Sequence, residues 1–194
     1  MSERLECYLE SKVRRQKMGK GNKPEAISLK IAELLAHASP GEKSEARNMS
    51  DFGSPFFWRI TAHFGIQEYE EDKWLNITKA IAILTPSRNT NSIHSKSRFF
   101  GTVLADGGLE YDNLDKPFFS ELRLSRLLNA PQKQRFIHLE RAVRMLARKQ
   151  PSIHIPSLAF AYIKKDIHYV AKDYYRRLCQ SELELIKKKE EANA

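Results

Sequence analysis

The apolar residues of segment 117–149 recur at the spacing of an α-helix, and this periodicity restricts the fold more than any other feature of the sequence. Two helices fit the segment, with a break near Pro131, because proline lacks an N–H and disfavours a helical residue before it. One broad face of the second helix is apolar and comprises Phe136, Leu139, Ala142, Val143, Leu146 and Ala147. The opposite face carries a stripe of arginines: Arg141, Arg144 and Arg148. We therefore expect one side of this helix to pack into a core while the other presents guanidinium groups, which suit phosphate oxygens.

Helical spacing extends through most of the remaining chain, and no run alternates cleanly over the length of a strand. Further helices are expected to begin at Pro24 and Pro55, to span Lys73–Leu84, and to run from Pro156 as one long final helix. The final helix carries a second basic stripe opposite its apolar residues, which includes Lys164, Lys165 and Lys172.

These patterns predict an all-α, two-lobed helical bundle of about eight or nine helices. The expected organisation is a polar N-terminal helix and loop at 1–23, a helical domain at 24–178 with lobes at 24–115 and 116–178, and a charged tail at 179–194. Segment 86–97 is rich in Ser and Asn and has no acidic residue, so it is expected to form a mobile basic loop.

The charge of the chain points to a polyanionic partner. The formal net charge is +9 and the sequence pI is about 9.5. The excess is uneven, because residues 122–150 hold eight basic residues and one acid, whereas residues 106–121 hold one lysine and five acids. Basic charge gathered in one segment predicts a binding patch, for nucleic acid first and for an anionic membrane second.

Sequence signatures of catalysis and metal binding were not found. No two of the six histidines are four residues apart, neither cysteine belongs to a C-x-x-C pair, and the common nucleophile, zinc and nucleotide motifs are missing. Glu110, Asp112 and Asp115 lack the spacing of a calcium loop and are interpreted as a solvated turn. The sequence thus favours a binding protein with no metal, no cofactor and no catalytic residue. The charged N-terminus and the lack of a long apolar run predict a cytoplasmic location.

The order of several short motifs resembles one known family. The motifs are an Arg-containing helix at 46–47, an aromatic helix at 55–64, FFGTVLADGG at 99–108, LRLSRLLNA at 122–130, HLERAVRMLA at 138–147, a Pro-containing turn at 155–158 and KDYYRRL at 172–178. This combination resembles the CasB family, the small subunit of the type I-E CRISPR surveillance complex Cascade, over roughly residues 25–178.

The resemblance implies an all-α, two-lobed protein without enzymatic activity. It implies that two copies lie head to tail in the complex, beside the other Cascade subunits, both backbone and large, and help hold the crRNA–target DNA duplex and the displaced strand. By position, it assigns nucleic-acid binding to Arg47, Arg123, Arg141 and the pair Lys164 and Lys165, and Arg126 and Arg144 extend the pattern. Arg148 and Lys172 join the predicted site through the two basic stripes. A patch that joins Arg123, Arg141, Lys164 and Lys165 is the resulting hypothesis.

Two other interpretations stay open at this stage. A stand-alone DNA-binding protein of helix-turn-helix type would use the turn at 129–132 and read bases with the residues that follow it. A metal-dependent nuclease would use the acidic residues at 110–115. Within the family interpretation, Asn48 follows Arg47 where the family often has a second arginine, and Arg126 fits a contact between lobes or subunits as well as a contact with nucleic acid.

Overall fold

The computed structural model of the chain describes residues 23–88, 91–109 and 116–192, and nine helices lie within these ranges. The helices are α2 (Pro24–His37), α3 (Pro40–Asn48), α4 (Pro55–Phe64), α5 (Glu68–Leu84), α6 (Phe100–Asp106), α7 (Glu121–Asn129), α8 (Gln132–Ala147), α9 (Ile155–Ile163) and α10 (His168–Ala192). The β pairing within the described ranges consists of two isolated bridges. The prediction of an all-α bundle is therefore confirmed, whereas the helix expected within residues 1–23 lies outside the described residues.

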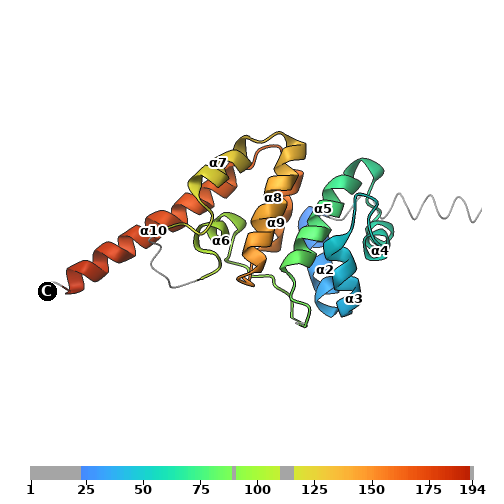
Figure 1. Cartoon of the computed structure of the whole chain (residues 1–194), viewed down its shortest axis with the longest axis horizontal. Helices are drawn as coiled ribbons and strands as arrows, with labels where there is room; N and C mark the ends of the chain where they lie inside the picture. Colours follow the sequence, from blue (N-terminus) through green and yellow to red (C-terminus); the bar gives the residue numbers. More distant parts are fainter. Residues whose placement is uncertain (1–22, 89–90, 110–115, 193–194) are drawn as a thin grey trace, which may run out of the picture.

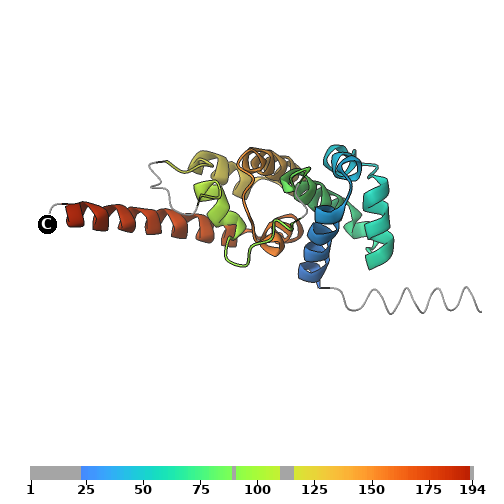
Figure 2. The ribbon, with the colours of Figure 1, turned by 90° about the horizontal axis from the view of Figure 1, so that it is seen from below.

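The helices are arranged along one long axis (Figure 1). Helices α2 to α5 lie at one end, α8 and α9 lie in the middle, and α10 extends away from the other end (Figures 1 and 2). Packing of α2 on α9 and of α5 on α8 joins the two halves, and one apolar core runs through both. Helix α6 packs mainly on α10, so it lies with the C-terminal helices. The lobe boundary at residue 115 stays a prediction.

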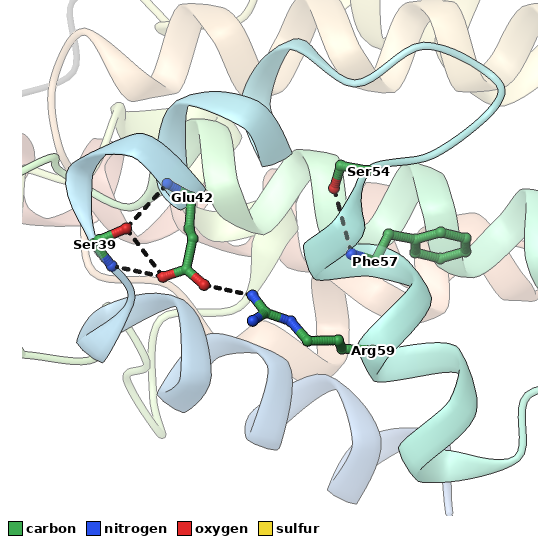
Figure 3. Close-up of polar contacts among 5 residues, drawn as sticks. All are labelled: Ser39, Glu42, Ser54, Phe57 and Arg59. Atoms are coloured by element: carbon green, nitrogen blue, oxygen red, sulfur yellow. Dashed lines mark hydrogen bonds and ion pairs between the residues drawn. The ribbon is translucent and has the colours of Figure 1, made fainter.

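Local sequence signals start several helices. Pro40 and Pro55 occupy first-turn positions, where a missing N–H has no cost. Ser39 and Glu42 form a capping box at the start of α3, and Arg59 of α4 pairs with the same Glu42 carboxylate (Figure 3). The Arg59 guanidinium and the Ser39 amide hold the pKa of the Glu42 carboxyl at about 2. This contact fastens α4 to the start of α3.

A close helix crossing and a buried ion cluster hold α10 against α6. A Cβ atom at Gly101 would lie 2.1 Å from the carbonyl oxygen of Val170, so glycine is required where the two helices cross. At the end of α6, the Asp106 carboxylate accepts from Arg98 at 2.7 Å and from Arg177 of α10 at 2.8 Å. The Asp106 side chain is fully buried, and its two partners are nearly so. We call these three residues the buried ion cluster.

The expected single helix from Pro156 to the C-terminal region is wrong, because the structure breaks it into α9 and α10 at residues 164–167. The Asp166 carboxylate accepts from the backbone N–H of His168 at 2.8 Å, a local bond that competes with continuation of the helix. Lys164 and Lys165 therefore lie in a connection, whereas Lys172 lies on α10. Beyond the break, α10 continues as a helix to Ala192, through most of the predicted charged tail.

The expectation of a mobile loop at 86–97 is also wrong for its second half, because residues 93–98 pair with the segment before α9. Ile153 donates to the Ile93 carbonyl at 2.9 Å, and His154 donates to the Arg98 carbonyl at 2.7 Å. Ile93 is buried, so this half of the segment contributes to the core. Residues 93–98 are ordered by their bonds to the distant residues 153–154, whereas their local composition predicted a mobile loop.

Two neutral histidines cap the start of α9 at this contact. His154 accepts from the N–H of Ser157 through Nδ1 at 3.2 Å, and His94 accepts from the N–H of Ile155 through Nδ1 at 3.3 Å. The two rings lie 5.3 Å apart between centroids. Burial lowers the pKa of both imidazoles, and the charge of Lys96 lowers the pKa of His94 further. A proton on the Nδ1 atom of either histidine would replace the acceptor with an N–H donor that faces the backbone N–H of α9, so protonation would break the cap.

We expect Asp106→Asn to lower the free energy of unfolding by about 3–5 kcal/mol, because it leaves two buried guanidinium groups with no carboxylate between them. Urea unfolding followed by circular dichroism measures the change. Glu33→Gln, which breaks the exposed pair with Lys30, is the control and should leave the midpoint unchanged. Equal midpoints for Asp106→Asn and the native protein would contradict the structural role of the cluster.

We also expect stability to fall as the pH is lowered through the histidine range. The folded pKa values of His94 and His154 are lowered, so the stability they contribute is present above the unfolded pKa near 6.5 and is lost as the pH falls toward the folded values. Unfolding midpoints between pH 7.5 and 5.5 test this. His154→Asn keeps a cap acceptor but does not titrate, so its profile should be flatter. Identical pH profiles for both proteins would contradict the assignment.

Candidate nucleic-acid interface

Five of the predicted arginines line one groove between α7 and α8. Arg123 and Arg126 project from α7, Arg141 and Arg144 project from the exposed face of α8, and Arg148 is the residue directly after α8. The groove has a volume of about 360 Å³ and is completed by Phe119, His138 and Met145. Nη1 of Arg123 lies 3.7 Å from the Met145 sulfur, which brings the α7 guanidinium over α8. The arginine stripe that the sequence predicts for α8 therefore shares one groove with two arginines of α7.

A larger cavity adjoins this groove where α5 and α8 end. It has a volume of about 1000 Å³, and its lining includes Arg47, Arg88, Arg144 and Arg148. Because Arg144 and Arg148 line both hollows, the two linings are continuous. We call the seven arginines of the combined lining the arginine belt: Arg47, Arg88, Arg123, Arg126, Arg141, Arg144 and Arg148. Within the described part of the chain, the residues that line the two hollows include no Asp or Glu.

Within the arginine belt, Arg47 also stabilises the end of α5. Its Nε donates to the Ala82 carbonyl at 2.8 Å, Nη1 donates to the Ser87 hydroxyl at 2.7 Å, and Nη2 donates to the Thr85 carbonyl. These carbonyls belong to the C-terminal end of α5, which lacks intrahelical donors and carries the negative end of the helix dipole. Arg47 therefore caps α5 and also positions residues 85–88 at the wall of the cavity.

Arg144 is oriented by a carboxylate on its own helix. Glu140 accepts from Arg144 at 2.8 Å and from Lys79 of α5 at 3.2 Å. Partial burial alone would raise the pKa of the Glu140 carboxyl, but the hydrogen bonds and charges of Arg144 and Lys79 outweigh it and lower the pKa. Glu140 thus stays ionised, joins α8 to α5, and holds the Arg144 side chain where both hollows meet.

The three predicted lysines do not line either hollow. The Lys164 ammonium lies over the rings of Phe160 and Tyr169, at 4.4 Å and 5.5 Å from their centroids. Lys172 is exposed on α10, and Lys165 is exposed in the connection before it. The patch that was to join these lysines with Arg123 and Arg141 stays a prediction, as does their contact with nucleic acid.

Two arginines of this region, Arg88 and Arg135, were named in the sequence only as part of the basic loop and of the helix-turn-helix alternative, and neither was among the predicted nucleic-acid-binding residues. Arg88 lies in the segment expected to be a loop, and only the packing of α5 against α8 brings it beside Arg148. Arg135 donates to the carbonyls of Lys164 and Lys165 at 3.3 Å and 2.8 Å, which fastens the start of α8 to the α9–α10 connection. Neither contact has a local sequence signal.

Other kinds of site find no support in the described residues. Residues 23–88, 91–109 and 116–192 contain no group of three or more His, Cys, Asp or Glu side chains arranged to hold a metal ion. The acidic residues considered for a nuclease, at 110–115, lie outside the described ranges. None of the described helices is both long and apolar enough to cross a membrane.

Comparison with known proteins gives one match. A family model described as CRISPR-associated protein Cse2 matches residues 30–177, which cover α3 to α9 together with most of α2 and part of α10. Neither the curated proteins nor the solved structures gave a match.

Because Arg47 caps α5, we expect its replacement to destabilise the fold. Arg47→Lys should lower the free energy of unfolding by about 1–3 kcal/mol, because a single ammonium group cannot reach both the Ala82 and the Thr85 carbonyls. Arg88→Lys, at an exposed position of the same cavity, is the matched control and should not change stability. Urea unfolding measures both, and equal midpoints for the two variants would contradict the capping role.

Proposed function

Because the chain belongs to the CRISPR-associated Cse2 family, the CasB small subunit of type I-E Cascade, we propose that its arginine belt grips nucleic-acid backbone within that complex. The ligands are the crRNA–target DNA duplex and the displaced strand, and the consequence of binding is a more stable R-loop. The subunit acts without catalysis, metal or cofactor, in the cytoplasm. Its protein partners are other Cascade subunits and a second copy of itself.

The observation that carries this proposal is the continuity of the belt. Seven guanidinium groups from α3, α7, α8 and the segment after α5 line two adjoining hollows whose described lining has no carboxylate. Guanidinium forks match phosphate oxygens in geometry as well as in charge. Seven guanidinium groups along one continuous lining can contact several phosphates, which is what holding a strand along its path requires.

The chemistry of the belt fits binding that is independent of base sequence. Two rings belong to the lining: Phe119 is buried and offers no platform for a stacked base, and His138 is half-buried. Phosphate contacts set position and carry no sequence information, and in guide-directed complexes the RNA reads the target by base pairing. A subunit that holds the backbone alone is sufficient for that task.

The helix-turn-helix interpretation is less well supported. The turn between α7 and α8 is present, but Arg135 at the start of α8 is engaged by the carbonyls of Lys164 and Lys165. That interaction takes one of the expected base-reading side chains away from the groove of a duplex. We therefore favour the Cascade role.

Binding of the isolated protein to non-specific single-stranded and double-stranded DNA over a salt series tests the proposal. If about five phosphates are contacted, the logarithm of the affinity for single strands should fall against the logarithm of salt with a slope of about −3.5. The variant Arg123→Ala/Arg141→Ala/Arg148→Ala removes three groups of the belt without touching the Arg47 cap. We expect it to weaken binding to both DNA forms and to reduce the slope for single strands by about 2.

The matched control is Lys164→Ala/Lys165→Ala/Lys172→Ala, which removes the same number of positive charges from the α9–α10 region. Retained binding in this control, together with loss in the arginine variant, supports the belt. The opposite pattern would place the interface on the lysines instead. If the isolated protein does not bind DNA, the same two variants are compared by R-loop lifetime in assembled Cascade.

A further inference from the structure

The two hollows of the arginine belt differ in the neutral side chains that accompany the arginines. The groove between α7 and α8 adds two rings and a thioether to its arginines. The larger cavity adds four neutral polar side chains, from Asn48, Thr85, Ser87 and Gln150. A guanidinium group only donates hydrogen bonds, whereas carboxamides and hydroxyls donate and accept them. The cavity is therefore equipped for a ligand group that is itself both donor and acceptor.

Two of these four polar side chains are engaged by the fold. The Thr85 side chain is buried and donates to the Ile81 carbonyl at 2.8 Å. The Ser87 hydroxyl accepts from Nη1 of Arg47 at 2.7 Å. By contrast, Asn48 and Gln150 are exposed, and their carboxamides bond to no residue that the structure describes. The two carboxamides are thus the groups of the cavity that are available to a ligand.

The backbone at Gln150 shows that its side chain is not explained by local structure. Its φ is 51°, and among the described residues it is the one non-glycine residue with a positive φ. Its N–H donates to the Ala147 carbonyl at 3.3 Å and so closes the end of α8, a position where glycine is usual and adopts this conformation without strain. Glutamine is strained there. A strained residue at the wall of a cavity indicates a use for its side chain.

Each carboxamide accompanies an arginine of the belt. Asn48 is the last residue of α3 and directly follows Arg47, and Gln150 lies two residues after Arg148. Two different elements thus bring one guanidinium and one carboxamide each to the same cavity. An RNA backbone repeats a matching pair of groups, because each ribose carries a 2′-hydroxyl beside its 3′ phosphate. That hydroxyl donates and accepts, and DNA lacks it.

Resting on the function proposed above, we propose that the large cavity binds a ribose–phosphate backbone, with the carboxamides of Asn48 and Gln150 bonded to 2′-hydroxyl groups. The cavity then favours RNA, whereas the groove between α7 and α8, which has no carboxamide, holds RNA and DNA backbone alike. In an A-form duplex the 2′-hydroxyls line a wide, shallow minor groove, so they can be reached while the bases are paired. The cavity is thereby assigned to the guide strand.

Binding of the full-length protein to single strands of one sequence, made as RNA, as DNA and as 2′-O-methyl RNA, tests the preference by fluorescence anisotropy. We expect RNA to bind at least about fivefold more tightly than DNA, because one net hydrogen bond changes affinity by about that factor. The 2′-O-methyl strand should bind no better than DNA, because it lacks the hydroxyl donor. Equal affinity for RNA and DNA, or binding of the methylated strand as tight as that of RNA, overturns the inference. So does a preference that follows base composition when the sequence is changed.

The variant Asn48→Ala/Gln150→Gly tests the two residues. We expect its affinity for RNA to fall to that for DNA, while its affinity for DNA stays within about twofold of the native value. Glycine relieves the positive φ at residue 150, so the urea midpoint should not fall. Asn129→Ala is the matched control, because Asn129 is an exposed asparagine at the last residue of α7 and lines neither hollow, and it should keep the RNA preference. An RNA preference that survives in the double variant overturns the assignment.

The failure of this inference and the failure of the proposed function give different results. If Arg123→Ala/Arg141→Ala/Arg148→Ala weakens binding to both RNA and DNA but the native protein does not distinguish them, the belt stands and the reading of the sugar is wrong. If the arginine variant binds both strands as the native protein does, the belt itself is wrong, and the inference falls with it.

Discussion

The arrangement of the C-terminal helices depends on one buried carboxylate. Asp106 lies at the end of α6 and is held between two guanidinium groups, from Arg98 before that helix and from Arg177 on α10. Taking three charges out of water is costly, and the cost is offset only while every charge keeps its partner. The cluster therefore permits one placement of α10 against α6. The close crossing at Gly101 belongs to the same placement, because a Cβ atom there would collide with the Val170 carbonyl oxygen.

The candidate interface depends on this placement through α10. The Tyr174 hydroxyl donates to the Phe119 carbonyl at 2.6 Å, and the Tyr175 hydroxyl donates to Glu121 at 3.1 Å. These two bonds attach the start of α7 to α10, so α7 is presented to α8 at a defined position. The two arginines of α7 can then meet the three of α8 across one groove. A chain of contacts thus leads from a buried carboxylate to an exposed row of guanidinium groups.

The belt also shows how one residue type serves two purposes. Arg47 uses its donors on the end of α5, and its charge at the cavity wall adds to that of Arg88, Arg144 and Arg148. Arg47 is half-buried, whereas the other six arginines of the belt are exposed and are better placed to meet a ligand. This division explains why positive charge can gather at the site without loss of local structure. The groups closest to the carbonyls stabilise the fold, and the outer groups are available to phosphate.

What the sequence by itself determined is what depends on neighbours along the chain. The helical class, the break at Pro131, and the exposure of Arg141, Arg144 and Arg148 opposite a buried face all follow from periodicity and from proline chemistry. The motif order also led to the right family, whose model matches residues 30–177. These features could be predicted from short segments of the sequence.

Tertiary structure decided the features that join distant residues. Burial of Asp106, pairing of Ile93 with Ile153 and the gathering of Arg88 with Arg148 connect positions about 60–70 residues apart, and no local pattern marks them. The break between α9 and α10, which separates Lys164 from Lys172, rests on the local bond to Asp166 and on Arg135, which reaches the connection from α8. Periodicity shows which face of a helix is buried, but which partner covers that face is set by the packing of the whole chain.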